Sequence, residues 1–200
     1  MSEPDITIEP LHADRWADLV TLFGPERGAY GRCWCMWWRV SGREFNALGG
    51  TGRRDAFRER AGQPPPPGLL AYRGDNAVGW VAVAPRDEFA RLSRSPLLKP
   101  IDNKSVWAIT CLYVAADQRR SGVAQRLIEA AVDFAADRGA PAVEAYPIDT
   151  DGDATDTTIY TGTMSMFTAA GFTEVARRKH RPILRRHLPE ERAPRAFRAP

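Results

Sequence analysis

The segment from residue 106 to residue 135 constrains the fold of this chain more than any other part. Residues 106–114 are almost continuously apolar, which is typical of a central strand buried on both faces. The period then changes, and apolar side chains recur at helical spacing at Val123, Ala124, Leu127, Ile128, Ala131, Val132 and Ala135. Gly139 and Pro141 end this helix. A doubly buried strand followed by a helix with one apolar face predicts an α/β fold.

The rest of the chain supplies further strands and helices around this unit. Alternating or apolar runs indicate strands, and helical spacing indicates helices; the strands are at 6–8, 69–72, 78–83, 142–146, 172–177 and 183–187, and the helices at 13–23, 43–60 and 163–170. Gly74, Asp75 and Asn76 between two of the strands predict a hairpin. We expect one domain over residues 1–187, a mixed sheet with helices packed on it, and a flexible basic tail at 188–200.

Charge is unevenly placed along the chain, although the net charge is only +3. From Arg177 onward there are nine Lys and Arg against two Glu. This segment could be a nucleic-acid arm, or a solvated last strand with a frayed tail. We favour the second interpretation, so nucleic acid is not an expected partner.

The sequence also indicates a compartment. No apolar run approaches the ~18 residues that a membrane span needs, and residues 1–5 are polar, without an apolar run after them. Three cysteines are too few for a disulfide scaffold and suit a reducing environment. We therefore expect a cytoplasmic protein without membrane contact.

The turn between the central strand and its helix has the composition of a phosphate site. It contains Arg119, Arg120, Ser121, Gly122, Val123 and Ala124. A helix start presents unpaired amides and the positive end of the helix dipole, Gly122 lets the backbone approach a ligand, and the two arginines add permanent positive charge. Neither a GxxxxGK[ST] loop nor a GxGxxG fingerprint occurs in the chain.

The pattern Arg119-x-x-Gly122-x-Ala124, after a buried strand, resembles the pyrophosphate-binding motif of the GNAT N-acyltransferase superfamily. Ala170-Gly171-Phe172 is similar to that family's last helix-to-strand turn. The resemblance covers residues 5 to 187 and is least typical at 30–62. It implies a single-domain, mostly antiparallel mixed sheet flanked by helices, and acetyl-CoA as the acyl donor.

The resemblance also implies how this donor is held. Backbone amides from Arg119 to Ala124 bind the pyrophosphate, and backbone groups of Leu112, Tyr113 and Val114 pair with the pantetheine arm. An N–H of that segment faces the thioester oxygen, a contact whose loss typically costs ~3 to 4 kcal/mol in other enzymes.

Two positions depart from the family pattern. Phe167 stands where many members have a tyrosine that protonates the thiolate, and Ala108 stands where some have a glutamate. Since a primary amine is mostly protonated near neutrality, a group must still take its proton. The candidate catalytic residues are Tyr160, Tyr113 and Glu144; Tyr160 could instead be a packing residue, and Glu144 a solvent-facing one.

Residues 30–38 are rich in aromatic side chains. Tyr30, Trp34, Trp37 and Trp38 could line the acceptor site and hold an aromatic or cationic amine, or they could belong to the core. Cys33 and Cys35 lack partners for a tetrahedral metal site, so we expect no metal. The acidic run 149–156 departs from the calcium-loop pattern and could instead attract a cationic acceptor.

These observations favour an N-acetyltransferase that moves an acetyl group from acetyl-CoA to a small-molecule amine by direct attack. No cysteine–histidine or serine–histidine–aspartate arrangement suggests a covalent intermediate. A protein or peptide amine is the alternative acceptor, and a non-catalytic acyl-CoA sensor is the alternative function. The oligomeric state is left open, a homodimer included.

Overall fold

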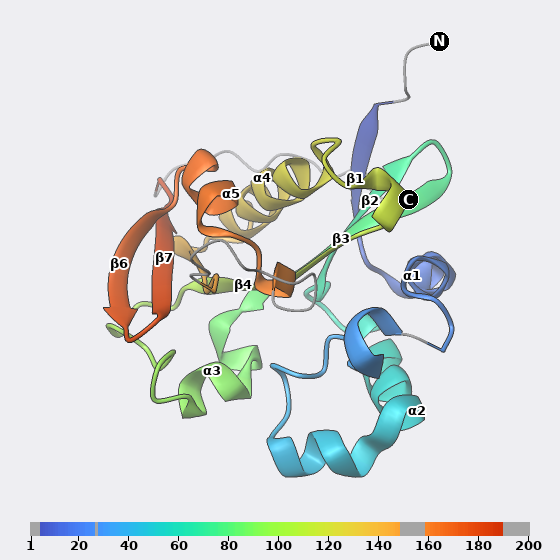
Figure 1. Ribbon diagram of the computed structural model, residues 1–200, viewed down its shortest axis with the longest axis horizontal. Helices are drawn as coiled ribbons and strands as arrows, with labels where there is room; N and C mark the ends of the chain where they lie inside the picture. Colours follow the sequence, from blue (N-terminus) through green and yellow to red (C-terminus); the bar gives the residue numbers. More distant parts are fainter. Residues whose placement is uncertain (1–4, 27, 149–158, 190–200) are drawn as a thin grey trace.

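The computed structural model describes residues 5–26, 28–148 and 159–189 and contains one seven-stranded sheet (Figure 1). The strand order is β1-β2-β3-β4-β5-β7-β6, and every neighbouring pair is antiparallel except β4 and β5. The strands are β1 (Ile6–Pro10), β2 (Gly68–Arg73), β3 (Asn76–Pro85), β4 (Trp107–Val114), β5 (Ala142–Ala145), β6 (Thr173–Arg178) and β7 (Arg181–His187).

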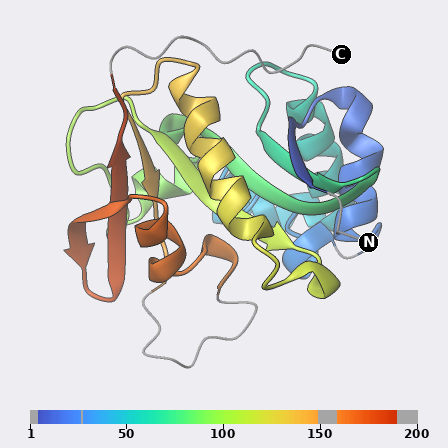
Figure 2. The same cartoon turned by 90° about the horizontal axis from the view of Figure 1, so that it is seen from above.

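Helices cover both faces of the sheet (Figure 2). The α-helices are α1 (Trp16–Phe23), α2 (Gly42–Ala61), α3 (Ala90–Arg94), α4 (Val123–Ala136) and α5 (Met164–Ala169). The apolar faces of α4 and α5 pack with one set of strand residues, and those of α1 and α2 pack with the set that points the other way. Short single turns add η1 (Ala13–Arg15), η2 (Gly28–Arg32), η3 (Arg86–Glu88), η4 (Ala116–Gln118) and η5 (Ile159–Thr161).

The sheet splits in the middle. β4 pairs with β3 along its whole length, but its parallel pairing with β5 ends at Ile109 and Ala145. The register between β3 and β4 shifts at the same level, because Val83 faces Ile109 and Ala82 faces Cys111, which leaves Thr110 as the extra residue of a β-bulge. Beyond this bulge, the edge of β4 toward β5 has no strand partner among the described residues.

The predicted α/β fold with a mixed, mostly antiparallel sheet is confirmed. The second predicted helix is interrupted within α2, since Gly49 has a φ of 60°. The structure adds α3 and the single turns, which are too short to give a helical period in the sequence. No helix in the described part of the chain is long and apolar enough to cross a bilayer. The predicted basic tail lies outside the described residues from 190 onward.

Candidate active site

The turn between β4 and α4 has the backbone geometry of an anion site. Gly122, the residue before α4, has a φ of 84°, and Arg120 has a φ of 62°. The Ser121 hydroxyl donates to the Gln118 carbonyl at 2.6 Å, which holds the turn closed. The amides at the start of α4 have no carbonyl one turn earlier to bind, so they are available to a ligand.

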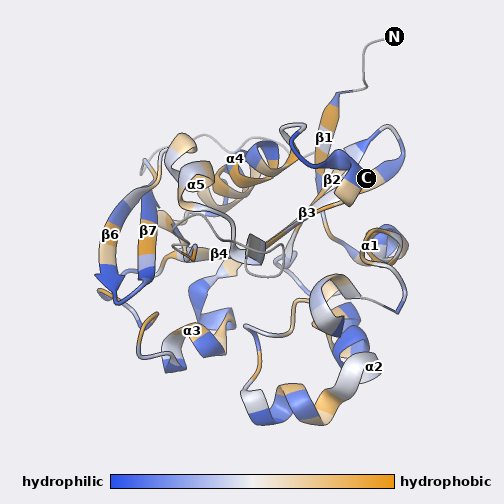
Figure 3. Cartoon of the chain, viewed as in Figure 1, coloured by the Kyte–Doolittle hydropathy of each residue, from blue (hydrophilic) through white to orange (hydrophobic). Residues whose placement is uncertain are grey.

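Positive charge surrounds this turn, which is hydrophilic in Figure 3. The side chains of Arg119 and Arg120 are exposed, and Arg73 from β2 donates to the Ser121 carbonyl at 3.4 Å. A Cβ on Gly122 would meet no atom within 4 Å, so the space in front of the helix is open. The predicted residues of the turn therefore lie together, in an arrangement suited to a pyrophosphate.

The open edge of β4 leads directly into this turn. Leu112 belongs to the core beneath α4 and α5, whereas Tyr113 packs on the side of α1 and α2. After Val114 the chain turns at once, since the Gln118 amide donates to the Ala115 carbonyl at 2.9 Å. A linear ligand can thus hydrogen-bond to the strand edge at one end and reach the amides of α4 at the other.

Three tyrosines from distant parts of the chain meet beside this edge. The ring centroids of Tyr30 and Tyr113 are 5.6 Å apart, and those of Tyr30 and Tyr160 are 5.8 Å apart. Burial, and to a lesser extent the neighbouring Cys111, raise the pKa of Tyr160 to about 12. Tyr160 is therefore a phenol at neutral pH, so it carries a proton that it can donate and cannot act as a base.

Phe167, where the resemblance expects a tyrosine, is fully buried in α5. Its ring packs against Phe172 with centroids 5.2 Å apart, and it contacts Gly162, at which a Cβ would also approach Leu112 to 3.1 Å. Gly162 follows η5 directly, so this packing fixes η5 and its Tyr160 against the open edge of β4.

Glu144 does not lie with the tyrosines but in a buried ionic network. Arg185 Nη2 lies 2.7 Å from Glu144 Oε1, Arg86 Nε lies 3.5 Å from Oε2, and the Tyr146 hydroxyl donates to Oε2 at 2.5 Å. Asp102 contacts the other side of Arg185 at 2.6 Å. Because this carboxylate is already bound by two cations and a hydroxyl, it is poorly placed to act as the base.

We expect Glu144→Gln to lower the free energy of unfolding by about 2 kcal/mol. This is less than the cost of removing one partner of a buried ion pair outright, since the amide oxygen still accepts a hydrogen bond. Urea unfolding measures the loss, and Glu129→Gln on the exposed face of α4 is the matched control. A variant of unchanged stability whose acetyl transfer is lost would instead make Glu144 a catalytic base.

The four predicted acceptor residues fall into different environments. Trp34 is core, with 2% of its surface exposed, and stacks on Trp16 with centroids 6.0 Å apart. Trp37 is 39% exposed and carries the Arg91 guanidinium 3.8 Å from its ring centroid. Trp38 is half-buried, and its Nε1 has no hydrogen-bond partner in the described structure. Only Tyr30 lies with the tyrosines at the β4 edge.

The cysteines lie close together without forming a metal site. Cys35 accepts a hydrogen bond from Trp80 Nε1 at 3.1 Å, and burial raises the pKa of Cys33 to about 12. Within residues 5–26, 28–148 and 159–189, no group of three or more His, Cys, Asp or Glu side chains could hold a metal ion. The acidic run 149–156, considered above as a calcium loop, lies outside these ranges.

Sequence reasoning missed two arginines near Tyr160. Arg91 in α3 and Arg181 at the start of β7 both interact electrostatically with the Tyr160 phenol. Neither belongs to a motif, and they are 90 positions apart, so no signal in a single sequence could have paired them.

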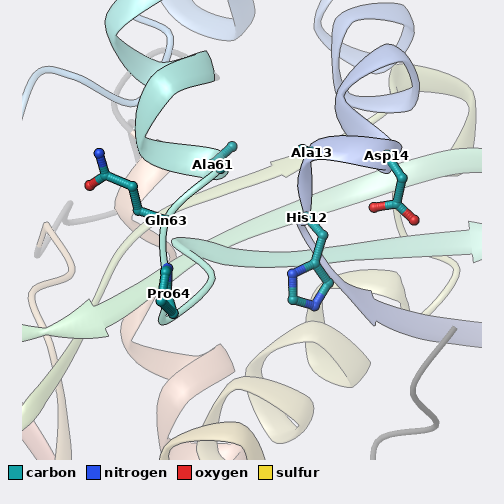
Figure 4. A pocket seen from close by; sticks show the side chains of 7 residues that line it. His12, Ala13, Asp14, Ala61, Gln63 and Pro64 are labelled. Atoms are coloured by element: carbon teal, nitrogen blue, oxygen red, sulfur yellow. The ribbon is translucent and has the colours of Figure 1, made fainter.

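Two shallow pockets lie elsewhere. One, of about 330 Å³, is lined by His12, Ala13, Asp14, Ala61, Gly62, Gln63 and Pro64 (Figure 4). The other, of about 410 Å³, shares Gln63 and Pro64 with it. Neither includes a residue of β4 or of the turn before α4. The candidate active site is placed at the split in the sheet because the open edge of β4 leads into that turn.

Comparisons with known proteins give one family match. Residues 34–156, which contain β4, the turn and α4, match the model of the acetyltransferase (GNAT) family. Among curated proteins, none matches the chain.

Several solved structures share the fold at low sequence identity. A mutant agmatine N-acetyltransferase without ligand has a TM-score of 0.56 at 13% identity, over 92% of this chain and 100% of that one. The PaiA N-acetyltransferase of Thermoplasma acidophilum in complex with coenzyme A has a TM-score of 0.52 at 13% identity, over 92% and 99%. The NatC complex bound to a Gag peptide and CoA has a TM-score of 0.55 at 14% identity, with the same coverage.

Proposed function

Because the chain belongs to the acetyltransferase (GNAT) family, and is therefore an acyltransferase, we propose that it moves an acetyl group from acetyl-CoA to the primary amine of a small molecule. The observation that carries this proposal is the continuity between the open edge of β4 and the amide turn before α4. One linear donor can contact both.

The donor is held by the residues of this edge and turn. The amides from Arg119 to Ala124, with the arginine charges beside them, bind its pyrophosphate. Backbone groups of Leu112 and Val114, beyond the bulge, pair with its pantetheine arm as a short added strand. The thioester then lies at the split between β4 and β5, near Tyr113 and Tyr160.

The amine attacks the thioester carbonyl directly. An N–H of the open β4 edge stabilises the oxyanion that forms. Tyr160 donates its proton to the departing sulfur, which leaves readily because a thiol has a pKa of only ~8.5. With Glu144 engaged in ion pairs and Tyr160 protonated, the ammonium loses one proton to water before attack. After the C–N bond has formed, the nitrogen loses a second proton, which restores the Tyr160 phenol.

A small acceptor is favoured by the crowding of this region. The ring contacts of Tyr30 with Tyr113 and Tyr160 close over the strand edge on the side of α1 and α2. An extended peptide would need an open groove there. The substrates named for the agmatine and NatC enzymes illustrate both acceptor classes, so the identity of the amine requires a direct test.

We expect Tyr160→Phe to reduce kcat roughly tenfold to a hundredfold and to leave the affinity for acetyl-CoA unchanged. The effect is at or below the lower end of the range for general acid catalysis because the thiolate is already a good leaving group. In the wild type, kcat/KM should rise tenfold per pH unit up to the amine pKa. Since the Tyr160 pKa is about 12, the donor stays protonated and no decline should follow below about pH 11.

Steady-state rates from pH 6 to 10.5, with an amine panel, measure both effects. A decline of kcat/KM between pH 8 and 9 would show that a different, more acidic donor acts. Tight acetyl-CoA binding without turnover of any amine would favour the sensor alternative, for which Phe167 in place of the family tyrosine is the supporting observation.

A further inference from the structure

Three unsatisfied hydrogen-bond donors lie around the small core cluster that contains Tyr146 and Ile183. Trp38 Nε1, Arg91 Nη2 and Arg181 Nε are buried atoms without a hydrogen-bond partner in the described structure. More than nine in ten buried polar groups in native proteins have such a partner. Trp38 packs against this cluster, Arg91 lies in the chain between its members Phe89 and Leu92, and Arg181 donates to the Tyr146 carbonyl. Three donors without partners around one cluster point to a ligand that supplies acceptors.

The structure fixes these donors in place. The Arg91 backbone amide donates to the Trp38 carbonyl at 3.1 Å, and Arg91 Nε donates to the Val40 carbonyl, also at 3.1 Å. Stacking on Trp37 holds the rest of the guanidinium. On the other side, Arg181 Nη2 donates to the Tyr146 carbonyl at 3.0 Å, so its Nε is the free position.

The charge of the two arginines is uncompensated, in contrast to that of other buried arginines. Arg39, Arg86 and Arg185 lie 2.6 to 3.5 Å from carboxylates. Arg91 and Arg181 form no ion pair with any described residue, and desolvation lowers the pKa of both. A partly buried cation without an anion is costly, and a ligand anion bound by both arginines reduces that cost.

We propose that the acceptor amine carries a carboxylate, which Arg91, Arg181 and the Trp38 indole bind beside Tyr160. Guanidinium groups recognise the planar carboxylate through paired N–H bonds. The amine of such a molecule then points toward the open edge of β4. This inference rests on the proposed function and replaces the cationic acceptor expected from the aromatic residues.

The experiment compares L-α-amino acids with their decarboxylated amines and their amides as acceptors. We expect kcat/KM to be at least tenfold higher for the carboxylate form. Arg91→Gln and Arg181→Gln should each raise the acceptor KM at least tenfold, leave the acetyl-CoA KM unchanged, and remove the preference for the carboxylate. Lysine at either position should restore part of it. Arg94 is an exposed arginine of α3, the helix that contains Arg91. Arg94→Gln is the control and should change neither the acceptor KM nor the preference for the carboxylate form.

Faster turnover of the decarboxylated amines, or an equal loss on both acceptor forms in the glutamine variants, would overturn the inference. An amino phosphonate turned over faster than its carboxylate analogue would also overturn it, in favour of a phosphate-bearing acceptor. If acetyl-CoA binds but no amine is acetylated, the proposed function fails. Calorimetric titration of amino acids and decarboxylated amines into the acetyl-CoA complex then tests the anion site alone, and equal affinities reject it.

Discussion

Gly122→Glu is expected to weaken acetyl-CoA binding at least a hundredfold while the protein stays folded. A Cβ on Gly122 points into the open space in front of α4, where the ligand phosphates would lie. The added carboxylate occupies that space and repels the phosphates at the helix end that should attract them. The left-handed φ of 84° adds a strain of about 1–2 kcal/mol, which is small enough for the fold to persist.

The same helix offers a matched control at its other end. Gly139 also has a positive φ, 73°, and a Cβ there also meets no atom within 4 Å. Gly139→Glu therefore introduces the same charge and a similar strain away from the turn, and should leave the affinity unchanged. Calorimetry with acetyl-CoA compares the three proteins. Wild-type affinity in a folded Gly122→Glu variant would contradict the placement of the donor.

Trp34→Ala is expected to lower the free energy of unfolding by about 3–5 kcal/mol, the usual cost of removing a buried tryptophan. Its ring packs against Trp16 and against Phe23, whose centroid lies 5.8 Å away. Gly28 lies so close to the indole that a side chain there would overlap it. Removing the ring leaves a cavity that these neighbours cannot close.

Trp37→Ala serves as the comparison in the same segment. Trp37 is exposed and mainly supports Arg91 and Phe45, so its loss should cost less than about 1 kcal/mol. It should instead raise the acceptor KM by loosening Arg91. Urea unfolding of both variants separates the two roles. Equal stability of the two variants would contradict the assignment of Trp34 to the core.

The regular elements could be predicted because their patterns are local. The helix at Val123–Ala136 and the hairpin of β2 and β3 follow directly from residue spacing and turn composition. The family resemblance is confirmed by the match over residues 34–156. The roles of the donor-binding residues in the β4 edge and the turn remain predictions, since they depend on a ligand.

The tryptophan segment could not be resolved from the sequence for a physical reason. Arg32, Trp34 and Cys35 have positive φ values of 58°, 46° and 54°, which non-glycine residues rarely adopt. Neither a helical nor a strand period applies to such a backbone, so spacing does not tell which ring points inward. The solvent-facing alternative for Glu144 is wrong, because the residue is only 2% exposed. Its partners Arg86 and Arg185 come from remote segments, so residue spacing gives no sign of them.

The split divides the sheet into two halves, which are joined by the short parallel pairing of β4 with β5. The last residues paired in this way are Ile109 and Ala145. Near them, the ion pair of Arg86 with Glu144 connects the two halves, and Arg185 also binds Glu144. Val114 lies five residues beyond Ile109 on β4, or about 16 Å at ~3.3 Å per residue. A slight rotation of one half of the sheet about the Ile109–Ala145 pair would therefore displace Val114 more than it displaces Ile109. We therefore expect substitutions in this buried network to change the width of the gap between β4 and β5, and with it the proposed donor site.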